Sequence, residues 1–427
     1  MDRWLWWPRF TCLPLLFLLL APQAANAVIR RAFVTSVSGN GNFSTWPDDG
    51  GLAGLAAANK ICQNRAAASG LGIPNPSGFR AFVSTDGPTG IDGYCNVLGL
   101  TGLKTANCNV SPPLPEAGPW RMANGATFFA HELVEILDSS PEILAPLARD
   151  ENFAALPSYE ASKFWTGTSQ YGIAVAPNCA NWTSASSAAD GRVGSGFGTS
   201  QRLANAGVSD CNETRRLLCL EGAAGDPLPP VTTVGSLVFV TSDYVSSDLG
   251  SDPRAAGATG VAAGDNICKS FAAEGHLPSP SSFFAYLGST GIDPANRITA
   301  PGPFVRPDGF IVANNEVDLF DGTTDNTIHQ TESGTYLSLS TFVHTGADSS
   351  GTATGDDCED WTYDDDVAFS STMGDAGLAR SELWTDQGSL FGCSIIARLY
   401  CFSNQVVLFW ESFELTGDLS RWSDVAP

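Results

Sequence analysis

Two stretches of the chain repeat the same order of apolar and polar segments. Each begins with a short β-prone run, at residues 32–36 and 238–242, that ends in polar residues. An amphipathic segment follows, at 55–69 in the first copy and 261–271 in the second. Its apolar residues recur at the three- and four-residue spacing of one helix face. The pattern therefore predicts a strand and then a helix at the start of each copy.

A second strand follows the helix in each copy. Large residues alternate along 78–84 and 282–288, so one face of each strand should pack against the helix. Both copies then enter long loops rich in Pro and Gly. The Asn-Gly pair at 124–125 and the Asp-Gly pair at 308–309 predict hairpin turns, because both positions can take a positive φ. The repeated order predicts two domains, each with its own core.

The cysteines fall at matching places in the two copies. An Ile-Cys pair lies on each predicted helix, a Cys-x-x-Trp-Thr motif stands later, and two more cysteines follow it at one spacing. Four cysteines in one domain allow three pairings. The first set is Cys62, Cys179, Cys211 and Cys219, and the second set is Cys268, Cys358, Cys393 and Cys401. Cys95 and Cys108 have no counterparts, and we expect them to pair with each other. A metal site is the alternative, but no histidine lies near them in the sequence.

The start of the chain has the features of a secretory signal peptide. Residues 1–27 combine a positive start, an apolar stretch and a small-x-small ending at Ala27. The apolar run is too short to span ~30 Å of hydrocarbon, so we expect cleavage after Ala27 rather than a membrane anchor. Of the 11 cysteines, Cys12 alone lies in this segment. The even number that remains predicts disulfides in an oxidising compartment. We expect a secreted, cell-surface or periplasmic protein with no membrane span.

The segments predict a signal peptide, a first domain, a Pro-rich linker, a second domain and a tail. Their ranges are 1–27, 28–222, 223–235, 236–403 and 404–427. The linker should be extended, and the two domains are expected to fold independently. The net charge of −23 argues against nucleic acid and acidic membrane surfaces as partners.

The full order of elements and motifs resembles the C-type lectin-like fold. It is most similar to the endostatin-like branch and to bacterial exported domains of unknown function of the spirochaete-lipoprotein type. The resemblance covers about residues 32–222 and 237–403. It implies an α+β architecture of two tandem domains. Each would be a twisted antiparallel sheet with one or two helices, long loops and disulfide staples.

The resemblance also implies a nested disulfide pattern in each domain. An outer bridge would tie the helix to the last strand, and an inner bridge would join two loops. The implied pairs are Cys62–Cys219 and Cys179–Cys211 in the first domain, and Cys268–Cys401 and Cys358–Cys393 in the second. The fold hosts unrelated activities, so the resemblance does not indicate a single function.

Calcium-dependent sugar binding is one activity of this fold. The motifs of its usual site are missing, because Trp182 is followed by Thr-Ser and Trp361 by Thr-Tyr. The second copy nevertheless concentrates acids that could coordinate a hard cation. The candidate calcium ligands are Asp356, Asp357, Glu359 and Asp360. A solvated acidic loop is the alternative, since the run lacks the spaced ligand order of a known calcium loop.

Catalysis has little support in the sequence. None of the four histidines recurs at a matched position in the other copy, and no serine nucleophile motif with partners stands out. Trp165 and Trp182 lie near an inner cysteine and are expected in the core. The sequence therefore predicts a monomeric, non-enzymatic binding or surface-interaction protein with an extracellular protein or glycan ligand. A structural component of an envelope or extracellular matrix is the alternative, followed by a hydrolase.

Overall fold

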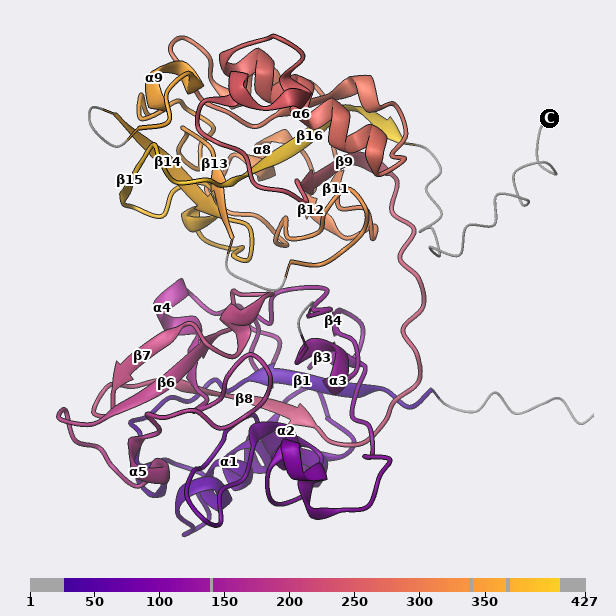
Figure 1. The fold of residues 1–427 in the computed structure, drawn as a ribbon. Helices are drawn as coiled ribbons and strands as arrows, with labels where there is room; N and C mark the ends of the chain where they lie inside the picture. The colour runs from indigo at the N-terminus through magenta and orange to yellow at the C-terminus, as the bar shows by residue number, and fades with distance from the viewer. Residues whose placement is uncertain (1–26, 139–140, 338–340, 366–368, 408–427) are drawn as a thin grey trace, which may run out of the picture.

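A computed structural model describes residues 27–138, 141–337, 341–365 and 369–407. The predicted signal peptide before Ala27 and the tail after Val407 lie outside this range. The chain forms two domains, drawn one above the other in Figure 1, and an extended segment along one side connects them. Among the described helices, none is both long and apolar enough to cross a membrane.

The first domain contains a long helix, several short helices and one sheet. Its elements are β1 (Arg30–Val34), α1 (Gly54–Ala68), β2 (Phe79–Ala81), α2 (Gly93–Val97), β3 (Trp120–Met122), β4 (Phe128–Ala130), α3 (Leu133–Ile136), α4 (Tyr159–Ser162), β5 (Lys163–Trp165), α5 (Cys179–Trp182), β6 (Asp190–Ser195), β7 (Gly207–Asp210) and β8 (Arg216–Glu221).

The second domain repeats this order with small changes. Its elements are β9 (Gly235–Val240), α6 (Gly260–Glu274), β10 (Phe283–Ala285), α7 (Pro294–Arg297), β11 (Phe304–Val305), β12 (Ile311–Ala313), α8 (Glu316–Leu319), β13 (Phe342–His344), α9 (Cys358–Trp361), β14 (Ser370–Asp375), β15 (Leu390–Gly392) and β16 (Arg398–Val407). β16 continues to Val407, so it includes the first residues of the predicted tail.

The two eight-stranded sheets have the same topology. Their orders are β4-β3-β1-β8-β5-β6-β7 and β12-β11-β9-β16-β13-β14-β15, with β2 and β10 paired to the last strands. The expectation of antiparallel sheets is wrong, because β1 pairs in parallel with β3, and β5 with β8. The second domain repeats both parallel pairs. Long intervening segments allow this, since they return the chain to the same end of the sheet.

Local patterns predicted the main elements correctly. The helix expected at 55–69 is α1, and the two predicted turns connect the hairpins β3–β4 and β11–β12. Gly125 and Gly309 adopt positive φ angles of 69° and 82° in these turns. The described residues thus form a mixed α and β protein with two matched domains.

Each sheet carries a core on both faces. Phe33 packs with α1 residues such as Ile61 on one face, whereas the next residue, Val34, packs with Phe129 and Leu147 on the other. The structure contains the five disulfides that the sequence and the resemblance suggested. They are Cys62–Cys219, Cys95–Cys108, Cys179–Cys211, Cys268–Cys401 and Cys358–Cys393. The outer bridge of each domain therefore ties its long helix to its last strand.

Candidate binding pocket between the domains

The two domains contact each other through matching loops. The loop after β6 meets the loop after β14, where Gly198 and Leu378 form an antiparallel β-bridge. The backbone N–H of Thr199 donates to the carbonyl of Gly377 at 3.1 Å, and its hydroxyl lies 2.6 Å from that of Thr327. Because β6 and β14 occupy the same place in the two sheets, equivalent parts of the repeat face each other.

A fully buried arginine joins the domains at this interface. Arg306 is 0% exposed and donates to the carbonyl of Leu144 in the first domain at 2.6 Å. Within its own domain it donates to Thr327 O at 3.1 Å and to the Asp308 carboxylate at 2.7 Å. The register of β3 and β11 places Met122 at the equivalent position in the first domain. No local sequence pattern marks Arg306 as buried, because an arginine is usually exposed unless a distant partner neutralises it.

A pocket of about 260 Å³ opens beside this interface, and both domains line it. The aromatic rings of Phe128 and Phe310 lie on its wall, one from each domain, with their centroids 6.1 Å apart. Met122 adds a flexible apolar side chain. The pocket combines apolar walls with a few polar groups, which is the usual composition of a small-molecule site.

Arg149 is the cationic group of this pocket that lacks a carboxylate partner. Its partly buried guanidinium lies 5.0 Å from the centre of the Phe153 ring, and among the described residues no carboxylate forms an ion pair with it. The pocket's second arginine, Arg380, is already paired with Asp325 at 3.0 Å. Burial and the nearby charge of Arg380 lower the pKa of Arg149, and the charges of Asp325 and Asp150 offset this only in part. An arginine still stays protonated at neutral pH.

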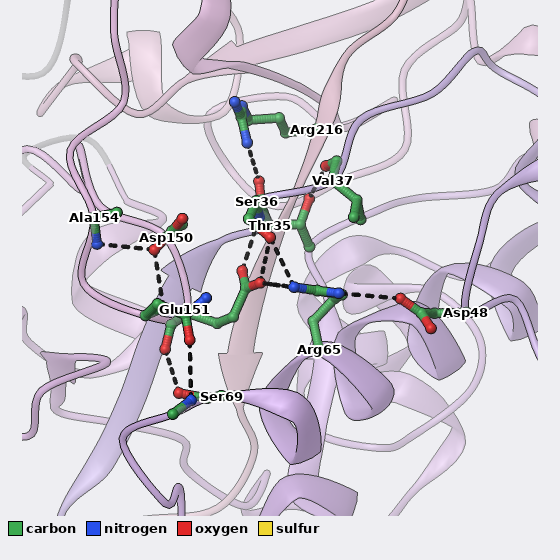
Figure 2. Close-up of polar contacts among 12 residues, drawn as sticks. Thr35, Ser36, Val37, Asp48, Arg65, Ser69, Asp150, Glu151, Ala154 and Arg216 are labelled. Carbon is green, nitrogen blue, oxygen red and sulfur yellow. Dashed lines mark hydrogen bonds and ion pairs between the residues drawn. The ribbon is translucent and has the colours of Figure 1, made fainter.

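Buried polar contacts fix the loop that carries Arg149, as Figure 2 shows. The buried Glu151 carboxylate accepts the backbone N–H of Ser36 at 2.7 Å and the Nε–H of Arg65 at 2.8 Å. Ser69 Oγ donates to the carbonyl of Glu151 at 2.5 Å. The backbone N–H of Val34, in β1, donates to the carbonyl of Arg149 at 3.1 Å. The loop is therefore anchored to β1 and to the end of α1, which positions Arg149 before any ligand binds.

The second domain contains the same loop without the arginine. Gln330 takes the place of Arg149, because its carbonyl accepts the N–H of Val240 at 3.0 Å, as that of Arg149 does from β1. Glu332 takes the place of Glu151 and accepts the N–H of Ser242 at 3.0 Å. Burial raises the pKa of Glu332. The recurring glutamate is thus part of the repeat's framework, whereas the arginine belongs to the first domain alone.

Three of the predicted calcium ligands, Asp356, Asp357 and Asp360, accept hydrogen bonds from nearby backbone or hydroxyl groups. Asp357 caps α9 by accepting the N–H of Asp360 at 3.0 Å, and burial raises its pKa. Asp360 accepts the N–H of Thr290 at 2.8 Å and the hydroxyl of Ser289, which together lower its pKa. Within the described ranges, no three ligand atoms converge at residues 356–360 as they do elsewhere. Calcium binding there stays a prediction.

A different group of possible metal ligands lies at the start of α3. One ligand atom each from His131, Glu132 and Glu135 lies within 4.8 Å of the others. Glu132 and Glu135 also form the capping box of α3, which accounts for their positions. Burial, together with a hydrogen bond and charge repulsion from Glu132, raises the pKa of Glu135 to about 8. The partly exposed carboxylates are explained by the cap, and we assign no metal to them.

Trp165, Trp182, His329 and His344 lie in the cores, whereas His276 is exposed. Trp165 and Trp182 are fully buried, and their indole N–H groups donate to Gly39 O at 3.0 Å and Ser84 O at 2.7 Å. Their core role is confirmed. His344, at the place of Trp165, is also fully buried, and burial lowers its pKa to about 4. His329 is buried as well, with a lowered pKa, so both imidazoles are neutral and shielded from solvent.

No family model and no curated protein matches this sequence. The pocket's own geometry and chemistry therefore carry the inference of function.

Proposed function

We propose that this chain is a secreted, non-enzymatic binding protein built of two tandem C-type lectin-like domains, with its ligand site between them. The observation that carries the proposal is the pocket to which both domains contribute an aromatic wall and polar groups. Ligand sites commonly lie at domain interfaces and combine apolar walls with a few convergent polar groups. The volume, about 260 Å³, suits a small molecule or one residue of a larger ligand.

The covalent framework supports an extracellular location. The described residues contain five disulfides, which are stable in an oxidising compartment. The predicted signal peptide would direct the chain to such a compartment. The matched domains, each with a bridge from its long helix to its last strand, support the C-type lectin-like assignment. In such scaffolds, loops held by rigid elements usually form the binding surface.

The chemistry of the pocket supports binding more than catalysis. Its acid among the described lining residues, Asp325, is paired with Arg380 at 3.0 Å and accepts a hydrogen bond from Asn314 at 3.0 Å. The guanidinium of Arg149 holds its proton at neutral pH and cannot serve as a general base. These groups can orient and hold a ligand, but they offer no free nucleophile or base.

A pocket-filling variant tests the proposal. Asn314 is exposed at the pocket rim, so Asn314→Trp should fill the site without entering a core. Val317→Trp is the control, because Val317 lies on the adjacent α8 and is 81% exposed. Thermal unfolding of residues 28–427 would be measured against small carbohydrates and carboxylic acids. A ligand at 100 times its Kd should add about 2.7 kcal/mol to the free energy of unfolding.

We expect at least one ligand class to raise the Tm of the wild type and of Val317→Trp, but not that of Asn314→Trp. Equal stabilisation of both variants would place the ligand elsewhere. No response from any ligand would contradict the binding function and favour the structural envelope or matrix role.

A further inference from the structure

We infer that the ligand of the interdomain pocket is a small carboxylate with an attached ring, held by Arg149 and packed against Phe128 and Phe310. This inference rests on the proposed binding function and specifies the chemical class of the ligand. It is based on the two arginines of the pocket. Arg380 forms an ion pair with Asp325, whereas no carboxylate among the described residues contacts Arg149.

The carboxylates near Arg149 are already engaged. One Asp150 oxygen accepts the backbone N–H groups of Asn152 and Ala154, each at 2.9 Å. Asp325 is paired with Arg380 at 3.0 Å. The positive charge of Arg149 is therefore left without a contacting counterion among the described residues, in a protein whose net charge is −23. A partly buried cation is stabilised when a ligand supplies the opposite charge.

The type of cation indicates the type of anion. A planar guanidinium can donate two parallel hydrogen bonds to a carboxylate or phosphate. The Phe153 ring contacts the guanidinium of Arg149 without accepting its N–H groups as a carboxylate would. The Asp325 carboxylate on the same wall would repel a dianionic phosphate more than a singly charged group. One positive charge without a contacting carboxylate among the described residues thus favours a singly charged anion such as a carboxylate.

The apolar walls indicate what carries the carboxylate. Phe128, Phe310 and Met122 line the pocket beside the arginine. A ring placed against them would remove apolar surface from water, which a simple ion such as acetate would not do to the same extent. An acidic monosaccharide and an aromatic acid share this chemistry and fit the small volume. The experiment distinguishes these two sources.

The pocket arginine is held in place in advance. Glu151, the next residue, is buried and bonded to Ser36 and Arg65, so the backbone that carries Arg149 is fixed (Figure 2). Preorganisation reduces the ordering cost of binding. The second domain keeps this loop with Gln330 in place of the arginine. Arg149→Gln should therefore preserve the loop while it removes the charge.

The test uses matched ligands that differ only in the charged group. Calorimetry on residues 28–427 would compare glucuronate with glucose, and benzoate with benzamide. We expect at least one carboxylate to bind about tenfold or more tightly than its neutral partner, and this ratio should shrink at high salt. Arg149→Gln should lower the ratio to about one. The control Arg80→Gln, whose arginine donates to Ser77 and Phe79 carbonyls, should keep it.

The outcomes separate this inference from the proposed function. If charged and neutral ligands bind equally and Asn314→Trp abolishes the binding of both, the inference of a carboxylate ligand is wrong, but the proposed binding function of the pocket is retained. A wild-type ratio that survives Arg149→Gln would also overturn it. Tighter binding of a ring phosphate than of the ring carboxylate would show that the assigned charge class is wrong. If no ring compound of either charge binds, the proposed function itself fails.

Discussion

Replacement of the buried arginine between the domains should strongly destabilise the protein. Arg306→Met introduces the residue that the first domain carries at the same register, Met122. It removes the hydrogen bonds to the carbonyls of Leu144 and Thr327 and the ion pair with Asp308. Breaking a buried ion pair from one side costs about 3–5 kcal/mol in the free energy of unfolding, because the remaining charge is left in the interior.

The value expected here is at the lower end of that range. Asp308 keeps a hydrogen bond from the Tyr336 hydroxyl at 2.9 Å and one from the N–H of Phe310 at 3.1 Å. The Leu144 carbonyl loses a donor from the opposite domain, which contributes about 1–3 kcal/mol of the total. We therefore expect a loss of about 3 kcal/mol.

Urea unfolding of residues 28–427, followed by tryptophan fluorescence at neutral pH, would measure this loss. Arg80→Met is the matched control, because its arginine donates to local carbonyls away from the interface, and it should cost less than about 0.5 kcal/mol. A loss below about 1 kcal/mol for Arg306→Met would refute the reasoning, since Arg306 would then not hold the domains together as described.

Three further predictions concern pH and the disulfides. Burial lowers the pKa of His344 from 6.5 to about 4. As the pH falls, the unfolded chain therefore binds a proton at this histidine before the folded protein does. The free energy of unfolding should fall by about 3 kcal/mol as the pH drops from 6.5 to 4. His344→Phe, compared by urea unfolding at both pH values, should lack this component. The pKa of Glu135 is raised from 4.5 to about 8, so its stabilising contribution is present at low pH and is lost as pH rises through 8. Glu135→Gln keeps an acceptor for the cap, and its stability relative to the wild type should increase from pH 6 to pH 9. Cys219→Ser should cost about 2–5 kcal/mol, and the double replacement of Cys95 and Cys108 by Ser should cost less, because their loop spans 13 residues instead of 157; an equal cost in urea unfolding would contradict the chain-entropy argument.

The sequence predicted the features that depend on local pattern. The amphipathic spacing at 55–69 corresponds to α1, and the Asn-Gly pair at 124–125 corresponds to a hairpin turn. The matching cysteines indicated two equally built domains. Each of these signals lies within a short stretch of chain, where periodicity or a turn residue determines the local structure.

The pocket could not be predicted because its parts come from distant segments. Phe128 and Phe310 lie in different domains, and Arg149 lies in a loop with no periodicity. The parallel strand pairs were missed for the same reason, since each joins strands separated by long connections.

The independent folding of the two domains stays a prediction. The buried interface between them gives a specific reason why it could fail. Fragments 28–225 and 232–405 would each expose groups that the whole chain buries, including Arg306 and Thr199. If both fragments are soluble and folded, the interface contributes stability without being needed for folding. If either requires the other, the two copies form one cooperative unit.

The crystal structure of residues 28–427 with the tightest ligand from calorimetry would test the central claim most directly. We expect a carboxylate within hydrogen-bond distance of the Arg149 guanidinium and a ring against Phe128 and Phe310, with both domains in contact with the ligand. A ligand bound by the loops of a single domain, such as the acidic loop at 356–360, with the interdomain pocket empty, would contradict it.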